Sequence, residues 1–251
     1  RSASAVTVAS RALQTLAWSM GGAPERVFYL PNGASTPEFE VVPPASGRST
    51  VLLYTRFFEF DLDRLWRVMR IVRESRRDVR FLVVGKGFAG EEDRLLALAG
   101  SAGWCVVRSE TPVIASAADV PDADLVYVGW GTATNLAACF GSADLGIYPF
   151  DDTLLNRTKC PMKLMDMLSA GIPVVADAVG QIAEAVVSGE TGRLVRVGDD
   201  RAFAGGVLSL LSDLESLRTM GRAARVDVSR RFGWDGLAAV ATAAYRYAAC
   251  R

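Results

Sequence analysis

A lysine and an aspartate three positions apart have the chemistry to hold two parts of a nucleotide. Lys163 and Asp166 lie in the segment CPMKLMDMLSAG, which follows the apolar run LGIYP and predicts a helix opening near Pro161. This spacing brings both side chains to one helix face, where the ammonium suits a phosphate and the carboxylate suits a ribose diol. Free N–H groups at the helix start, Cys160 to Lys163, also favour an anion. A solvated ion pair between the two side chains is the competing interpretation.

Arg56 is a second candidate for binding phosphate. It follows the apolar run TVLLYT, which predicts a buried strand. Ligands of open α/β sheets bind beyond the carboxyl ends of the strands, and a guanidinium can donate two parallel hydrogen bonds to a phosphate. The alternative is a structural pair between Arg56 and Glu59 or Asp61.

The elements that must position these residues follow an α/β pattern. Short β-branched runs alternate with longer amphipathic stretches from about residue 50 onward, which predicts a doubly wound, Rossmann-like parallel sheet. The expected strands are Thr50–Thr55, Val79–Gly85, Trp104–Arg108, Leu125–Val128, Leu145–Pro149, Ile172–Ala176 and Gly192–Val197. The expected helices include Asp61–Ser75, Arg201–Ser212, Leu214–Phe232 and Trp234–Cys250.

Composition excludes several kinds of chemistry. With 28 basic and 28 acidic residues, the chain has no global attraction to nucleic acid or to an anionic membrane. The absence of histidine excludes Ser-His-Asp hydrolysis and imidazole acid–base catalysis. The four cysteines are scattered, which predicts no metal site and a reducing compartment. No apolar run reaches the roughly 20 residues that cross a bilayer, so we expect a cytoplasmic protein, with the inner face of the membrane as the alternative location.

The order of these motifs resembles the group-1 family of retaining glycosyltransferases, in which two Rossmann-like domains face each other in the GT-B fold. PNG at 31–33 is similar to the interdomain hinge of that family. LYTR, ending at Arg56, resembles the first strand of the C-terminal domain with its phosphate-binding arginine, and LVVGKG resembles the second strand and turn. MLSAG, IPVVA and SGETGRLV resemble later segments, so the resemblance covers about Ala5 to Tyr247.

The resemblance implies a site for a nucleoside-diphosphate sugar. Asp166 matches the second of two acidic residues separated by seven others, whereas the first position falls on Thr158, which carries no charge. The family's phosphate-binding lysine is missing after Arg56, so Lys163, or alternatively Lys159, would supply the second cation. By the same resemblance, the site also includes Lys86, Gly87 and Trp130 near the base and Cys160, Pro161, Met162 and Leu164 of a Cys-Pro-x-Lys-Leu variant.

The resemblance also divides the chain into parts. Residues 1–34 are interpreted as a remnant of the N-terminal acceptor domain, because two expected strands, Ala5–Ser10 and Val27–Leu30, lead into the chain-reversal signal Pro-Asn-Gly. Residues 35–48 are the expected interdomain linker, and residues 49–233 are the expected nucleotide-sugar-binding domain. Residues 234–251 are expected to form a helix that packs back on the N-terminal domain, whose bulk we expect to be missing.

We therefore expect a hexosyltransferase-type enzyme of polysaccharide or glycolipid biosynthesis that transfers a sugar with retention and needs no metal or other cofactor. Arg56 and Lys163 would stabilise the departing diphosphate. The missing domain would hold the acceptor and make any membrane contact, so the chain alone would bind donor without turnover. A non-catalytic sugar-nucleotide-binding or scaffold protein and a sugar-nucleotide epimerase of the same fold remain alternatives. A dehydrogenase is disfavoured because no GxGxxG turn follows the first strand.

Overall fold

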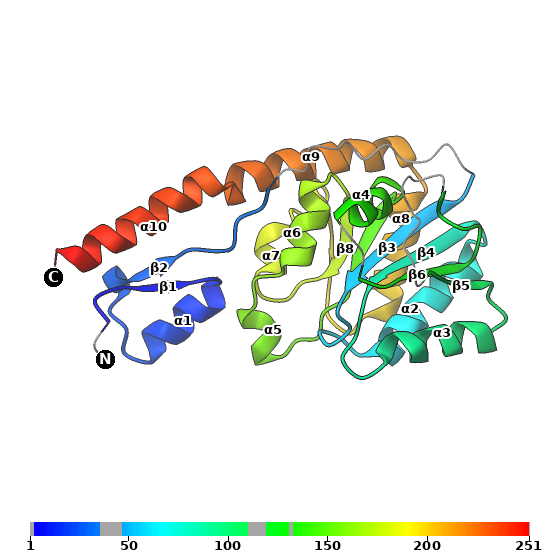
Figure 1. Ribbon diagram of the computed structural model, residues 1–251, viewed down its shortest axis with the longest axis horizontal. Coiled ribbons are helices and arrows are strands. Elements are labelled where there is room, and N and C mark those ends of the chain that lie inside the picture. The colour runs from blue at the N-terminus through cyan, green and yellow to red at the C-terminus, as the bar shows by residue number, and fades with distance from the viewer. Residues whose placement is uncertain (1–2, 36–46, 110–118, 131–132, 251) are drawn as a thin grey trace.

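A computed structural model describes residues 3–35, 47–109, 119–130 and 133–250 of the chain. Most of the expected linker, 35–48, lies outside these ranges. Figure 1 shows a large α/β body from which a small N-terminal unit and the last helix extend to one side. None of the helices within the described ranges is long and apolar enough to cross a membrane.

The body is built on a seven-stranded parallel sheet, as the alternation of runs predicted. Its strands are β3 (Ser49–Thr55), β4 (Val79–Gly85), β5 (Val106–Ser109), β6 (Leu125–Val128), β7 (Leu145–Tyr148), β8 (Val174–Asp177) and β9 (Gly192–Val195). They are ordered β5-β6-β4-β3-β7-β8-β9, and every pair is parallel. The chain builds outward in both directions from β3, so the strand order reverses between β3 and β7. Such a switch point is where open α/β sheets bind ligands.

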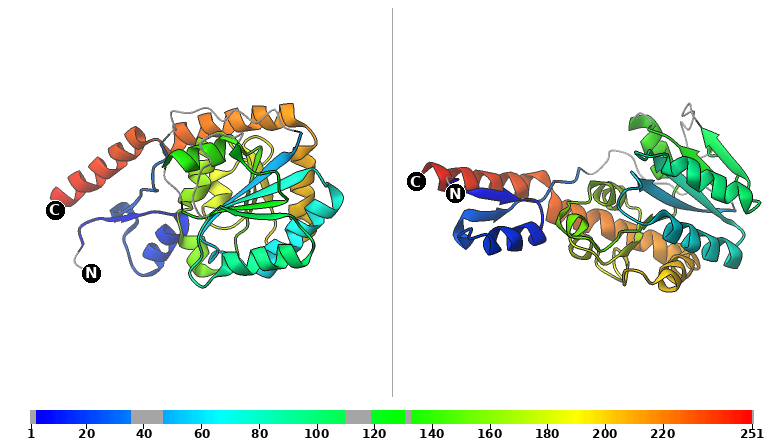
Figure 2. Two further views of the ribbon diagram at one scale, coloured as in Figure 1. Left: turned by 45° about the vertical axis from the view of Figure 1, so that its right-hand side comes forward. Right: turned by 90° about the horizontal axis from the view of Figure 1, so that it is seen from below.

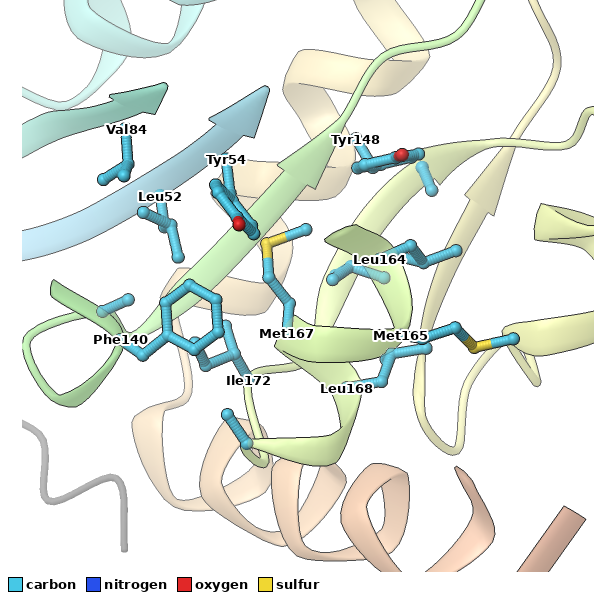
Figure 3. Packing of buried hydrophobic residues seen from close by; sticks show 14 of the residues in the cluster. Leu52, Tyr54, Val84, Phe140, Tyr148, Leu164, Met165, Met167, Leu168 and Ile172 are labelled. Atoms are coloured by element: carbon cyan, nitrogen blue, oxygen red, sulfur yellow. The ribbon is translucent and has the colours of Figure 1, made fainter. Parts of the chain in front are cut away.

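Helices cover both faces of this sheet, which confirms the doubly wound fold class. The core on one face contains residues of α2 (Leu62–Ser75), α3 (Glu91–Ser101) and α8 (Asp200–Leu211). The core on the other contains residues of α4 (Ala133–Gly141), α6 (Met162–Ser169), α7 (Ile182–Ala185) and α9 (Leu214–Phe232). Alternate residues of β3 enter the two cores, and Figure 3 shows Leu52 and Tyr54 on the α6 side with Leu164 and Met167.

One glycine holds the carboxyl ends of the two central strands together. Gly85 ends β4 with φ of +128°, and a Cβ there would lie 1.9 Å from the carbonyl oxygen of Thr55, the last residue of β3. Any side chain would therefore force the two strand ends apart. The close approach keeps Arg56, the residue that follows β3, at the edge of the switch point.

The N-terminal unit is a small βαβ arrangement with its own two-stranded sheet. Strands β1 (Val6–Val8) and β2 (Val27–Tyr29) pair in parallel around α1 (Arg11–Ser19). Helix α10 (Trp234–Ala249) packs on both strands, with the rings of Phe28 and Tyr247 5.7 Å apart. Figure 2 shows this unit and α10 lying together beside the large body in both views.

Hydrogen bonds tie the N-terminal unit to the loops that surround α6. The Ser10 hydroxyl donates to the carbonyl oxygen of Thr158 at 2.8 Å, and the Gln181 amide donates to the carbonyl oxygen of Ala9 at 3.1 Å. The Tyr29 hydroxyl donates to the Glu184 carboxylate at 3.1 Å. The unit therefore contacts the loop before α6 and the start of α7.

Candidate functional site

A narrow crevice marks the switch point of the sheet. Tyr54 and Thr55 of β3, Tyr148 of β7, and the side chains of Glu59 and Lys163 all line it. The crevice has no room for a water molecule. A ligand would therefore lie over its rim, where charged side chains are partly exposed, and not within it.

Arg56 lies at this rim without a carboxylate partner. Its guanidinium carbon is 4.8 Å from the ring centre of Trp130 and 5.5 Å from that of Phe88. The guanidinium forms no hydrogen bond or ion pair with any described residue. The expected alternative, a pair with Glu59 or Asp61, is therefore wrong; Asp61 instead caps α2 by accepting a hydrogen bond from the Asp63 N–H at 3.0 Å.

A strained residue directly follows Arg56 and fixes its direction. Phe57 has φ of +68°, a conformation that costs a bulky residue about 1 to 3 kcal/mol. Its ring is only 2% exposed and packs 6.2 Å from that of Phe60, while its N–H donates to the Thr55 hydroxyl at 2.8 Å. Burial and this hydrogen bond hold the turn, which sends Phe57 into the core and leaves Arg56 at the edge.

Lys163 and Asp166 share one face of α6, as their spacing predicted, yet no ion pair joins them within the described structure. The Lys163 ammonium lies 5.8 Å from the ring centre of Tyr54. Burial lowers the pKa of Lys163; the charge of Glu59 opposes this lowering and the charge of Arg56 adds to it, so the two cations lie close enough to repel each other. Burial also raises the pKa of Asp166 to about 6, although the charge of Lys163 opposes the rise.

The start of α6 offers fewer free N–H groups than the sequence suggested. The Met162 N–H donates to the carbonyl oxygen of Cys160, and the Leu164 N–H donates to that of Pro161, each at 3.0 Å. The N–H of Lys163 has no acceptor among the described residues. Within the described structure, Cys160 and Lys163 are therefore the residues of this turn whose N–H groups have no acceptor.

Three other residues of the CPMKL segment are not among those that line the crevice. Leu164 is fully buried in the core (Figure 3), and Pro161 is buried as well. The Cys160 thiol is in hydrogen-bonding contact with Asn32, and burial raises the pKa of this thiol. These three residues position the helix start, and their side chains do not line the crevice.

Thr158 and Lys159 are engaged in local contacts. The Thr158 hydroxyl donates to the carbonyl oxygen of Leu155 at 2.9 Å, in the last turn of α5 (Leu154–Thr158). The Lys159 ammonium donates to the Asn156 side chain at 3.1 Å and lies 3.9 Å from the ring centre of Phe58. Lys163, with its ammonium free of hydrogen bonds to the described residues, is the better second cation.

The turn after β4 is held by carboxylates of α3. The Gly87 N–H donates to Glu92 at 3.0 Å, and a Cβ at Gly87 would lie 2.2 Å from a carboxylate oxygen of Glu91. Lys86 is exposed next to this turn. Because the N–H of Gly87 already has an acceptor, the turn has one backbone donor fewer for a base.

Three aromatic rings lie at the rim, and two of them, Phe58 and Phe88, had no role in the sequence prediction. Phe58, Phe88 and Trp130 are 45%, 71% and 46% exposed, and the rings of Phe58 and Phe88 are 5.5 Å apart. The sequence places Trp130 near the base only by resemblance, and it suggests nothing for the two phenylalanines. The run FFEF directly after Arg56 could have drawn attention to Phe58, which stays exposed while Phe57 and Phe60 are buried; no comparable signal marks Phe88.

Comparison with known proteins agrees with the fold. A family model described as "Glycosyl transferases group 1" matches residues 48–213, which is more than half of the chain. The chain belongs to this family. The resemblance read from the motifs is therefore confirmed at the level of a group 1 glycosyltransferase with a GT-B type fold.

Curated relatives of this glycosyltransferase chain are larger proteins. It is 26% identical over 227 residues to a phosphatidyl-myo-inositol mannosyltransferase of Mycobacterium leprae, which covers 88% of this chain and 54% of that protein. It is 31% identical over 102 residues to an N-acetyl-alpha-D-glucosaminyl L-malate synthase of Bacillus anthracis, covering 41% and 26%. The chain thus spans about half the length of the first relative and less of the second.

Solved glycosyltransferase structures share the fold over nearly the whole chain. TarM of S. aureus, in a complex with UDP, has a TM-score of 0.70 at 14% identity and covers 96% of this chain and 44% of its own. The sucrose-phosphate synthase of Thermosynechococcus elongatus has a TM-score of 0.69 at 22% identity, covering 96% and 57%. HepE of Anabaena, in a complex with UDP and glucose, has a TM-score of 0.66 at 18% identity, covering 93% and 60%.

Proposed function

We propose that this glycosyltransferase chain forms the donor site for a nucleoside-diphosphate sugar and binds the diphosphate between Arg56 and Lys163. The observation that carries the proposal is the convergence of these two cations at the switch point, where neither forms an ion pair with a described carboxylate. The charge of the buried Glu59 offsets part of their mutual repulsion, and an anion bound between them would offset more of it. A diphosphate supplies that anion.

The relatives and structural neighbours support this donor class. The relatives named above include a mannosyltransferase and a glucosaminyl-transferring synthase, and the solved neighbours include complexes with UDP and with UDP and glucose. We infer that the donor here is of the same chemical class, a hexose carried on a nucleoside diphosphate.

In the proposed reaction, charge stabilisation at the leaving group supplies most of the catalysis. As the bond from the sugar carbon to the phosphate oxygen breaks, negative charge grows on the diphosphate while the sugar gains oxocarbenium character. Arg56, the Lys163 ammonium and the Lys163 N–H lie where they can stabilise that charge. We propose that these cations remove the need for a metal ion and that the acceptor hydroxyl attacks with retention.

Asp166 holds the ribose in this proposal. Its carboxylate lies three residues after Lys163 on the same helix face and forms no hydrogen bond to a described side chain. An ionised carboxylate can accept a hydrogen bond from each hydroxyl of a ribose diol. One helix would thereby bind the phosphate and the ribose together.

The acceptor belongs to another domain in this proposal. Solved neighbours contain more than this chain, since TarM and the sucrose-phosphate synthase are matched over 44% and 57% of their own lengths. We propose that a preceding domain supplies the acceptor pocket, so this chain binds donor but does not transfer sugar by itself. Transfer of labelled sugar by the 251-residue chain alone would contradict that division.

Calorimetric titration with UDP, GDP and ADP tests the donor site. We expect one of these nucleotides to bind with equal affinity in magnesium and in EDTA. Arg56→Met and Lys163→Met should each weaken binding by about 10- to 100-fold, because hydrogen bonds to charged groups contribute about 1.5 to 3 kcal/mol. Arg67→Met removes a partly exposed arginine paired with Asp200 and should leave binding unchanged. If none of the three nucleotides binds, or if Arg67→Met weakens binding as much, the donor site is refuted.

A non-catalytic sugar-nucleotide-binding protein is the second candidate, and Thr158 favours it. No charge stands at the position that resembles the family's first acidic residue, and the Thr158 hydroxyl already donates to Leu155. The titration does not separate the two candidates, because both bind donor. Transfer in the presence of the complete acceptor domain would establish the enzyme, and donor binding without any transfer under those conditions would establish the binding protein.

A further inference from the structure

The ring of Trp130 lies against Arg56 and connects it indirectly to Lys163. The Arg56 guanidinium carbon is 4.8 Å from the Trp130 ring centre, and Trp130 meets Tyr54 edge to face with ring centres 6.4 Å apart. Lys163 in turn lies 5.8 Å from the Tyr54 ring centre. Two aromatic rings thus bridge the two cations at the switch point.

From this arrangement we propose that Trp130 is a positioning residue that holds the Arg56 guanidinium in place for the diphosphate. The proposal rests on the donor site described above and deepens it. It also gives Trp130 a task other than contact with the base, near which the family resemblance places it.

A ring positions a guanidinium differently from a carboxylate. A carboxylate partner would take up the N–H donors of Arg56 and cancel its charge, both of which an incoming phosphate needs. An aromatic face attracts the cation with about 0.5 to 2 kcal/mol and contacts its flat side, so the N–H edge stays free. The ring therefore limits the motion of the side chain and leaves its charge available.

The packing of Tyr54 in the core supports this ring arrangement. Tyr54 is 9% exposed and packs edge to face on Phe140 with ring centres 5.5 Å apart, as Figure 3 shows for the two labelled side chains. The ring of Phe88 is a second aromatic neighbour of Arg56, with its centre 5.5 Å from the guanidinium carbon. Arg56 is therefore restrained by rings from two different loops, after β4 and after β6.

A double-mutant cycle with UDP as the probe separates positioning from base stacking. If Trp130 acts through Arg56, its ring contributes nothing to UDP affinity once the guanidinium is removed. The losses in binding free energy from the two substitutions are then strongly non-additive. If the ring instead stacks on the uracil, the two losses add. A merely structural role would change the free energy of unfolding without producing this coupling.

We expect Trp130→Ala to weaken UDP binding about fivefold, as the loss of one cation–π contact implies. In the Arg56→Met background the same substitution should weaken binding less than about twofold, the usual limit of additivity error. Trp130→Phe keeps an aromatic face and should restore most of the affinity, which also guards against misfolding of the alanine variant. The nucleotide that binds best in the preceding titration replaces UDP if UDP is not the tightest.

Additive losses, or full affinity in Trp130→Ala, would overturn the positioning role. These outcomes leave the donor site intact, because the unsubstituted chain still binds the nucleotide and Arg56→Met still weakens it. Absence of nucleotide binding by the unsubstituted chain would instead refute the proposed function itself.

Discussion

Two groups of cations in this chain have the same chemistry but opposite surroundings. On the α2 side of the sheet, Arg64 donates to Asp177 at 2.6 and 2.9 Å and to Asp200 at 2.9 Å. At the rim of the switch point, Arg56 and Lys163 contact aromatic rings and pair with no described carboxylate. The difference separates cations that stabilise the fold from cations that are available to a ligand.

The same contrast appears in the carboxylates. Asp177 is completely buried, and it accepts hydrogen bonds from Arg64 and from the Phe150 N–H at 2.8 Å. Asp166 is half-buried, accepts no hydrogen bond from a described side chain, and has its pKa raised to about 6 by burial. One buried carboxylate therefore stabilises the fold, whereas the ionised form of the other, our proposed ribose ligand, lowers the stability of the empty site at neutral pH.

The largest expected effect is on the free energy of unfolding and tests the ion-paired arginines on the α2 side of the sheet. Arg64→Met leaves the buried Asp177 carboxylate without its main partner, which should reduce the free energy of unfolding by about 3 to 5 kcal/mol. Arg67→Met is the matched control, since it also removes an arginine paired with Asp200. The Arg67 side chain is 54% exposed and that of Arg64 7% exposed, so the control should cost about 0 to 1 kcal/mol. Urea denaturation measures the free energy of unfolding of both variants. Equal losses would show that the buried ion pair of Arg64 stabilises the fold no more than an exposed one.

Asp166→Asn tests the carboxylate without an ion pair, and it should raise the free energy of unfolding where Arg64→Met lowers it. Because the pKa of Asp166 in the folded chain is about 6 and its ordinary value is 3.8, the folded state favours the protonated carboxyl. Its contribution to stability is complete below about pH 3.8 and is lost as the pH rises through 6. The substitution should therefore stabilise the empty chain at pH 7.5 by up to about 3 kcal/mol.

Denaturation of both proteins at pH 4 and pH 7.5 provides the measurement. The gain from Asp166→Asn should shrink toward zero at pH 4, where the wild-type carboxyl is protonated as well. A gain that is the same at both pH values, or a loss at pH 7.5, would show that Asp166 is not an unpaired buried carboxylate.

The ionisation of Asp166 should also affect donor binding. UDP-glucose suits the test because its diphosphate has no proton that titrates near pH 6. If ionised Asp166 accepts the ribose hydroxyls, affinity should fall by up to about tenfold for each pH unit below 6. In Asp166→Asn this dependence should disappear, and calorimetry at pH 5, 6 and 7 distinguishes the two. An unchanged pH profile in the variant would remove Asp166 from the site.

The smallest expected effect concerns the contact between the rim and the N-terminal unit. Ser10 is buried, caps α1 by accepting from the Leu13 N–H at 3.1 Å, and donates to the carbonyl oxygen of Thr158 at the end of α5. Ser10→Ala should cost about 1 to 2 kcal/mol from the lost cap and the lost donor. Thr15→Ala, in which the lost hydroxyl bonds only within α1, is a control expected to cost less. Thermal unfolding that ranks the two in the reverse order would show that this contact contributes little.

The sequence could predict most of the fold and the elements that carry the candidate site residues, because both depend on local patterns. Each expected strand of the seven-stranded sheet is present within a few residues, since the alternating apolar runs specify buried parallel strands. The positions of Arg56 at a strand end and of Lys163 and Asp166 on one helix face follow from the same periodicity. The order of the strands brings the end of β3, which Arg56 follows, to the crevice that Lys163 lines.

The parts that the sequence could not predict depend on contacts between distant loops. Cys160 and Leu164 are neighbours of Lys163 in the motif, but a helix directs neighbouring side chains to different faces, so Leu164 enters the core and Cys160 contacts Asn32. The ring of Phe88 reaches Arg56 from the loop after β4, and no local pattern encodes that contact. The positive φ of Phe57 likewise has no signal in the residue type.

A crystal structure of this chain with bound UDP, or with whichever nucleoside diphosphate binds most tightly, tests the central claim most directly. The account predicts that phosphate oxygens lie within hydrogen-bonding distance of both the Arg56 guanidinium and the Lys163 ammonium, over the crevice between β3 and β7. A nucleotide bound elsewhere, or one whose phosphates contact neither cation, would contradict it.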